Sequence, residues 1–109
     1  NNKKIRRSYL GINMSDLSVS SSFLKKYGIE LDKNIISGVV VLEVFKGSSC
    51  ERADLKKGDV IVSLGKYNVS NVAELKYYLS KYAPGEEIEI EIIRNKDHIK
   101  KNVTLDENE

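Results

Sequence analysis

The sequence predicts a small α+β domain with about five strands and two helices, and three observations support this fold class. The chain has 109 residues, which is enough for one hydrophobic core. Its composition of 40% hydrophobic and 31% charged residues is typical of a globular domain. Apolar residues recur at every second position in several short segments and at helical spacing in one longer segment.

The strands are predicted from β-branched and alternating segments. Residues 38–45 are the clearest, because they are rich in β-branched side chains. Residues 88–92 alternate isoleucine with glutamate, as a half-buried strand does. Shorter strands are predicted at 9–14, 60–64 and 103–105.

The main helix is predicted over residues 71–82. Asn71 is a good N-cap, and Glu74 three residues later can reach back toward the cap. A short helix is predicted at 23–28, where a glycine closes it, and one helical turn at 48–55. The long helix carries the apolar stripe, so it is the helix expected to pack on the sheet.

Composition and residue counts exclude several function classes. A net charge of +2 with scattered lysines does not favour nucleic-acid binding, and no apolar run approaches the roughly 20 residues needed to enter a membrane. The single histidine, His98, is expected on the surface, and the single cysteine, Cys50, is expected to be a buried thiol. Asp59 is expected to organise a turn. We therefore expect no catalytic residues, no metal site and no cofactor in this chain.

Three segments in register resemble the PDZ domain, and specifically the PDZ domains attached to HtrA/Deg-type trypsin-like serine proteases. They are Tyr9-Leu10-Gly11-Ile12, the stretch from residue 38 to residue 61 with its Gly58-Asp59 turn, and the helix at 71–82 followed by Pro84-Gly85. The resemblance implies a partly open β-barrel or sandwich of about five to six strands with two helices, in the permuted topology of bacterial PDZ domains.

The first segment resembles the loop with which this family binds a peptide carboxylate. A glycine-containing turn can point successive amides into one concavity, as a free carboxylate requires. The resemblance therefore assigns the carboxylate-binding loop to Tyr9, Leu10, Gly11 and Ile12, and the side chains of Leu10 and Ile12 are expected to line the pocket. Arg7 is a charge expected near the carboxylate or, alternatively, in a solvated linker.

The peptide groove is expected between the following strand and the main helix. The resemblance places Asn13 and Met14 on the strand side. On the helix side it places Val72, Leu75, Lys76 and Leu79. The alternative is that Leu10, Ile12 and Met14 are core residues of an edge strand, and that Leu75 lies on the stripe that faces the core.

The resemblance also implies a division of the chain and a function. Residues 1–8 are expected to be a linker from an absent upstream protease domain, 9–106 the PDZ domain and 107–109 a tail. The partners are expected to be C-terminal or unfolded peptides with hydrophobic ends, bound by β-strand addition, and the protease domain that the module regulates or supplies with substrate. The location is expected to be extracytoplasmic, at the cell surface or in the periplasm, in a parent protein that is membrane-anchored or secreted.

Two alternatives remain at this point. The domain could belong to another PDZ-containing protease, of the tail-specific or the membrane-embedded site-2 type. It could also be an oligomerisation module, because an exposed edge strand recruits a second copy as readily as it recruits a peptide.

Overall fold

The computed structural model describes residues 7–17, 21–31, 35 and 37–108 and contains two antiparallel sheets. Strands β2, β3, β4, β6 and β7 follow one another in a six-stranded sheet, with β5 paired to β4, while β1 and β8 form a separate pair. The strands are β1 Arg7–Tyr9, β2 Ile12–Asp16, β3 Val39–Val44, β4 Val60–Leu64, β5 Tyr67–Asn68, β6 Glu87–Arg94, β7 Asp97–Thr104 and β8 Asp106–Asn108. The helices are α1 Ser21–Lys25, α2 Ser49–Arg52 and α3 Val72–Leu79.

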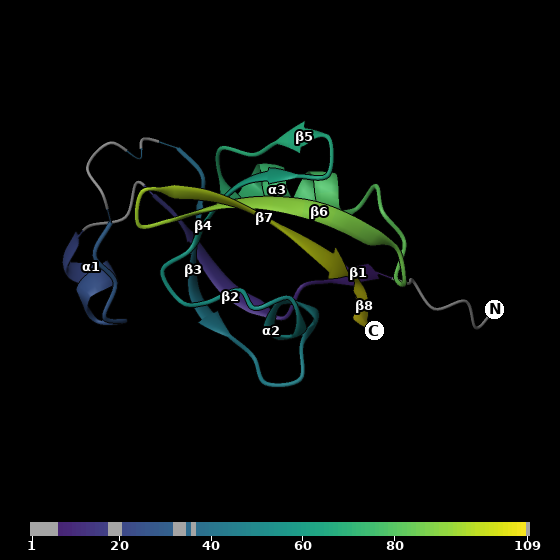
Figure 1. Cartoon of the computed structure of the whole chain (residues 1–109), viewed down its shortest axis with the longest axis horizontal. Helices are drawn as coiled ribbons and strands as arrows, with labels where there is room; N and C mark the ends of the chain where they lie inside the picture. The colour runs from purple at the N-terminus through teal and green to yellow at the C-terminus, as the bar shows by residue number, and fades with distance from the viewer. Residues whose placement is uncertain (1–6, 18–20, 32–34, 36, 109) are drawn as a thin grey trace.

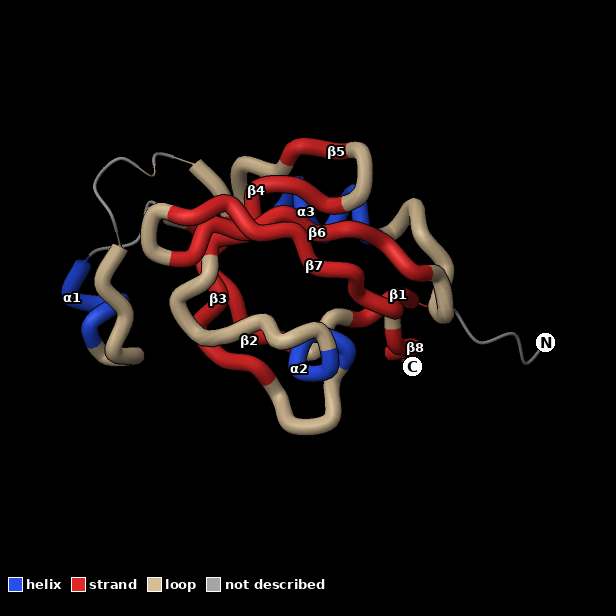
Figure 2. Tube along the Cα trace, in the orientation of Figure 1, coloured by secondary structure: helices blue, strands red, loops and turns tan. Residues whose placement is uncertain are grey.

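The elements are arranged along one long direction. Strands β1 and β8 lie together at one end of the molecule with α2 beside β8, and α1 lies at the opposite end (Figure 1). The long β6–β7 hairpin crosses the front, and α3 lies behind β6 in this view (Figure 2). This arrangement confirms the predicted α+β class.

Strand β3 is buried on both faces, which explains its run of four consecutive valine and leucine side chains. Val39 and Val41 pack into the main core with residues of β4, β6, β7 and α3. Val40 and Leu42 face the other way. They pack against Leu24 of α1 and against Ile29, which follows α1; residues 21–31 are called the α1 segment here. The α1 segment is therefore a cover over the second face of β3.

Helix α3 begins as its sequence predicts. The Asn71 side chain accepts a hydrogen bond from the Glu74 amide at 2.8 Å. Glu74 in turn accepts from the amide of Ser70 at 2.8 Å, one residue earlier than the reciprocal contact predicted with Asn71. The helix ends at Leu79, and the following turn continues to Tyr82 through hydrogen bonds of the helical type.

Three strands differ from their predictions. The segment predicted as one strand at 9–14 is divided, because Gly11 at φ +76 breaks it between β1 and β2. Strand β7 begins at Asp97, well before the predicted 103–105, because its first half exposes charged residues that hide the apolar alternation. The two-residue strand β5 was not predicted at all.

The predicted domain limits also differ from the described strands. Arg7 pairs with Asn108 and Ser8 with Glu107, so residues expected in the linker and the tail form the β1–β8 pair. Residues 1–6 of the expected linker and residue 109 of the expected tail lie outside the described residues.

Candidate functional site

The loop between β1 and β2 is held through its carbonyl groups. The Leu10 carbonyl accepts two hydrogen bonds from the α2 segment, from the Ser49 hydroxyl at 3.1 Å and from the Cys50 amide at 3.2 Å. The Gly11 carbonyl accepts from the Phe45 amide at 2.9 Å. Two successive carbonyls of the loop are thus bonded to the body of the domain.

These bonds fix the direction of the loop amides. In a trans peptide the C=O of one residue and the N–H of the next point in opposite directions, and every peptide described here is trans. The Gly11 N–H therefore points away from α2, and the Ile12 N–H points away from Phe45 on the β3 side. The Phe45–Gly11 bond also makes Ile12 and Val44 a non-hydrogen-bonded pair, so the Ile12 N–H faces the outer edge of β2.

Glycine is required at position 11 for two reasons. Its φ of +76° lies in the left-handed region that side chains disfavour, and a Cβ there would lie 2.1 Å from the Ser48 Cβ. Ser48 is buried against the loop, where it also caps α2 by accepting from the Glu51 amide. The N-cap residue of α2 therefore packs directly against the backbone of the loop at Gly11, with no room for a side chain between them.

Strand β2 continues from this loop and lies beside α3. Among the described strands, β2 pairs only with β3, so its other edge carries no strand. The Asp16 carboxylate at the end of β2 accepts a hydrogen bond from the Val72 amide at 2.7 Å. This bond joins the far end of β2 to the beginning of α3 and sets the two elements side by side.

The helical positions of the predicted groove residues separate them into two groups. At roughly 100° per residue, Leu75 lies at the centre of the apolar stripe, with Val72 and Leu79 on one flank. Leu75 is fully buried in the core, at 0% exposure, so the prediction that it lines the groove is wrong. Val72 and Leu79 are partly buried, and Lys76 beyond them is exposed.

The strand side shows a similar division. Leu10 is 3% exposed and its side chain packs in the core, so the prediction that this side chain lines the pocket is wrong. Ile12 and Met14 are partly buried against the same core, and Asn13 is exposed. Partly buried apolar residues of β2 and of α3 thus lie on either side of the β2–α3 junction.

The other flank of α3 is held by aromatic contacts. Tyr78 stacks on Tyr67 of β5 at a centroid distance of 4.4 Å, and Tyr82 meets the same ring edge-on at 6.3 Å. These contacts occupy the flank opposite Val72 and Leu79. The flank that carries Val72 and Leu79, toward β2, has no such aromatic contact among the described residues.

Several residues that shape this site were not predicted as site residues. Asp16, Ser49 and Asp106 all act through hydrogen bonds to backbone amides or carbonyls distant in sequence. The backbones of Arg7 and Tyr9 lie in β1, where Tyr9 pairs with Asp106. Single serine and aspartate residues carry no sequence signal for such contacts.

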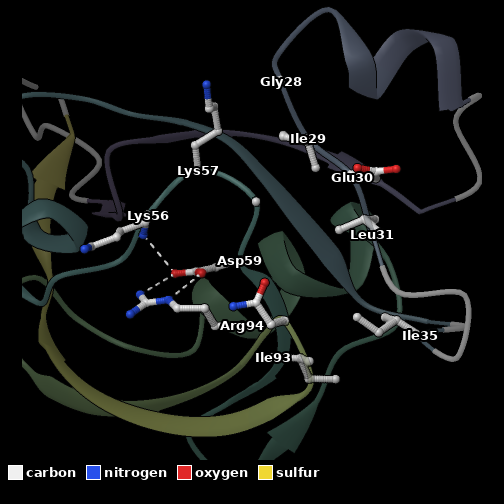
Figure 3. Close-up of a pocket in the computed structure, with 12 residues that line it drawn as sticks. Gly28, Ile29, Glu30, Leu31, Ile35, Lys56, Lys57, Asp59, Ile93 and Arg94 are labelled. Carbon is white, nitrogen blue, oxygen red and sulfur yellow. Dashed lines mark hydrogen bonds and ion pairs between the residues drawn. The ribbon is translucent and has the colours of Figure 1, made fainter.

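A shallow pocket lies elsewhere, between residues 28–31 with Ile35 and the turn at 56–59 (Figure 3). Its volume is about 210 Å³, below the roughly 300 Å³ at which small-molecule sites begin. In its wall Asp59 accepts two hydrogen bonds from Arg94 and one from the Lys56 amide, all at 2.8–2.9 Å. The hydrogen bond with Asp59 is the main cause that raises the pKa of Arg94. As predicted, Asp59 organises its turn.

The single histidine and the single cysteine lie where the sequence predicts, one on the surface and one buried. His98 is exposed and pairs with Glu91 at 2.9 Å. Cys50 is fully buried, and burial, followed by the charge of Asp106, raises the pKa of its thiol to about 12. Within the described ranges, no cluster of three His, Cys, Asp or Glu side chains is arranged to hold a metal, and no helix is long and apolar enough to cross a membrane.

Comparison with known proteins matches residues 8–105 to the PDZ domain family. The chain is 34% identical over 97% of its length to Serine protease Do-like HtrA of Bacillus subtilis (strain 168). It is 30% identical over 94% of its length to Periplasmic pH-dependent serine endoprotease DegQ of Escherichia coli (strain K12). The chain spans 24% and 21% of these two relatives, so most of each relative has no counterpart here.

The fold is shared with a solved structure of an isolated domain. The HtrA3 PDZ domain bound to the phage-derived ligand FGRWV superposes with a TM-score of 0.72, at 20% identity. The match covers 95% of this chain and 89% of that one. At this identity the comparison concerns the fold alone.

Proposed function

The chain belongs to the PDZ domain family, and from that premise we propose that it binds C-terminal or unfolded peptides with hydrophobic ends by adding them as a strand to β2. Main-chain hydrogen bonds along the outer edge of β2 would supply affinity. The apolar side chains on either side of the β2–α3 junction would supply selectivity. The chain itself acts as a binding module.

The orientation of the Gly11 and Ile12 amides is the observation that carries this proposal. Bonds to the carbonyls of Leu10 and Gly11 turn these amides away from the domain body, at the point where the outer edge of β2 begins. A peptide paired with β2 and ending here would place its terminal carboxylate at these donors. Charge-assisted bonds of this kind are stronger than neutral ones.

The surrounding side chains favour a hydrophobic last residue. Ile12 and Met14 from β2 and Val72 and Leu79 from α3 are all partly buried apolar residues of the same cluster. A terminal side chain seated among them would remove apolar surface from water on both partners. Lys76 on the exposed side of Val72 is a cation that a more distant acidic ligand group would approach.

The parent protein is proposed to be an HtrA-like serine protease that this module regulates or supplies with substrate. Two relatives named as serine proteases match nearly the whole chain, which favours this type over tail-specific or site-2-type proteases. One of those relatives is named as periplasmic. An extracytoplasmic location, in a membrane-anchored or secreted parent, belongs to the same proposal.

A second candidate function is self-association, and the outer edge of β2 favours it. An unpaired edge can add a strand from a second copy as well as from a peptide. The two functions differ in their demand for a terminal carboxylate, because an internal strand of a second copy has none.

The first experiment compares acid and amide forms of one peptide. Fluorescein-labelled FGRWV, and versions ending in leucine, isoleucine or phenylalanine, are titrated with the 109-residue chain. We expect micromolar binding for at least one acid, about −8 kcal/mol, and at least a roughly tenfold loss on amidation. Equal affinity of each acid and its amide would refute the carboxylate proposal.

A variant on α3 tests the apolar wall. Leu79→Lys introduces a charge at a partly buried position, so we expect a folded domain that no longer binds the acid peptide. Thermal melting is measured on the same sample to establish that it is folded. Sedimentation velocity of the wild type tests self-association: a dimer that saturating acid peptide dissociates would support the second candidate, because both ligands compete for the same edge of β2.

A further inference from the structure

The loop from Tyr9 to Ile12, here called the carboxylate loop after its proposed role, is supported by a small group of residues on the side away from the proposed ligand. This group, here called the brace, consists of Ser49, Arg52 and Asp106. The Ser49 hydroxyl donates to the Leu10 carbonyl, and the Ser49 amide donates to the Asp106 carboxylate at 2.8 Å. The second oxygen of that carboxylate forms an ion pair with Arg52.

The brace joins segments that are distant in sequence. Ser49 and Arg52 belong to α2, and Asp106 belongs to β8. Asp106 also lies opposite Tyr9, the last residue of β1 and the first of the loop, in the β1–β8 pair. Arg52 adds a hydrogen bond to the Gly47 carbonyl at 2.7 Å, which closes the turn before α2.

The brace controls one rotation in particular. The peptide plane between Leu10 and Gly11 is free to turn unless its carbonyl is held, because the glycine at φ +76 permits more than one orientation. Ser49 and Cys50 hold that carbonyl on the α2 side, so the Gly11 N–H is fixed on the opposite side. Asp106 fixes the Ser49 backbone and with it the position of the hydroxyl.

We infer that Ser49 and Asp106 are positioning residues, which make affinity for a peptide carboxylate depend on contacts behind the loop. The inference rests on the proposed function. A donor that is already oriented loses less freedom when the ligand binds, so removing its support weakens binding without removing a ligand contact. The effect is specific to the carboxylate, because the strand edge and the apolar wall are left in place.

The test measures the ratio of the affinities for acid and amide forms of the FGRWV series in four variants. Ser49→Ala removes the hydroxyl, and Asp106→Ala removes the acceptor for the Ser49 amide. Asp106→Asn keeps an acceptor oxygen at that place and serves as the conservative variant. Ile92→Val deletes one methylene from the centre of the sheet and controls for a general loss of stability.

We expect the ratio to fall roughly fivefold in Ser49→Ala and in Asp106→Ala, the equivalent of one lost hydrogen bond. Asp106→Asn should restore part of the ratio, because it keeps an acceptor for the Ser49 amide but loses the ion pair with Arg52. Ile92→Val should leave the ratio unchanged even though its melting temperature falls. Affinity for the amide form should stay constant in all four variants.

Two outcomes overturn the inference in distinguishable ways. If wild type has a ratio of one, the proposed function fails and the inference fails with it. If wild type discriminates and both Ser49→Ala and Asp106→Ala keep its ratio while melting earlier, the brace is merely structural. If either alanine variant does not fold, the comparison of the other with Asp106→Asn decides.

Discussion

Two turns of this domain are each supported by an arginine–aspartate pair, and the pairs differ in burial. Asp59 and Arg94 support the turn before β4, with side chains 2% and 26% exposed. Asp106 and Arg52 support the carboxylate loop, with side chains 32% and 54% exposed. The buried pair lies in the wall of the shallow pocket, and the exposed pair lies behind the loop that we propose binds a peptide carboxylate.

The difference in burial predicts whether each pair contributes mainly to stability or mainly to the geometry of its turn. A buried carboxylate that loses its partners leaves unsatisfied groups in the interior, so the Asp59 pair should matter for stability. An exposed pair is screened by water and salt and contributes little to stability, so the Asp106 pair should matter through the geometry it imposes. Asp59→Ala and Arg52→Met test this separation directly, and changes at Gly11 and Cys50 test other contacts between the loop and α2.

The largest effect is expected from Asp59→Ala. The change leaves the Lys56 amide without its acceptor and leaves Arg94 with only its bond to the Asp54 carbonyl. We expect a loss of about 3 kcal/mol in the free energy of unfolding. Urea denaturation measures it, with the exposed Asp97→Ala as control. A changed acid-to-amide affinity ratio in the folded fraction would break the separation between the two turns.

The next effect is expected from Gly11→Ala, compared with Gly47→Ala. Both glycines have positive φ, but an added Cβ would meet Ser48 at position 11 and nothing within 4 Å at position 47. Both variants should lose about 1–2 kcal/mol of stability through backbone strain. Only Gly11→Ala should also weaken binding of the acid peptide, by at least about tenfold, because the loop must move away from α2. Similar affinities for both variants would contradict this role of the Ser48 contact.

A smaller effect is expected from Arg52→Met. The variant keeps the aliphatic stem and removes the ion pair with Asp106 and the bond to Gly47. Stability should change by less than about 1 kcal/mol, while carboxylate discrimination falls about threefold. High salt should reproduce part of this loss in wild type, since the pair is exposed. A large drop in melting temperature would show that this pair resembles the buried one.

The smallest effect concerns Cys50, whose thiol lies behind the loop. Burial raises its pKa from 9.0 to about 12 in the folded state, so the folded state favours the protonated form. The associated stability is complete below about pH 9 and is lost as the pH rises toward about 12. Cys50→Ala should therefore show a shallower decline of unfolding free energy over this interval than wild type. Parallel declines would indicate that the thiol does not contribute.

The sequence predicted the elements whose packing is regular. The strand at 60–64 and the cap at Asn71 were correct, because β-branched runs and helix caps are local properties. The resemblance to PDZ domains of HtrA-type proteases was confirmed by the relatives. The β1–β8 pair was missed because its partners are about 100 residues apart and neither segment alternates.

The site was predictable where it depends on residue type and not where it depends on register around a helix. Helical spacing places Leu75 at the centre of the stripe, but only packing shows that this centre faces the core and not a groove. The contributions of Ser49 and Asp106 depend on tertiary contacts to backbone groups, which leave no pattern in the sequence.

The β1–β8 pair also has a mechanical consequence. Because the strands are antiparallel, the chain enters at Arg7 and leaves at Asn108 from the same point. Tension between segments attached there would separate the paired residues one after another. After Arg7 and Asn108, the pair of Ser8 and Glu107 would open, and then the pair of Tyr9 and Asp106. The third pair contains Asp106, which accepts the hydrogen bond from the Ser49 amide. Force applied at the two ends of the β1–β8 pair would therefore loosen the carboxylate loop before it disturbed the core.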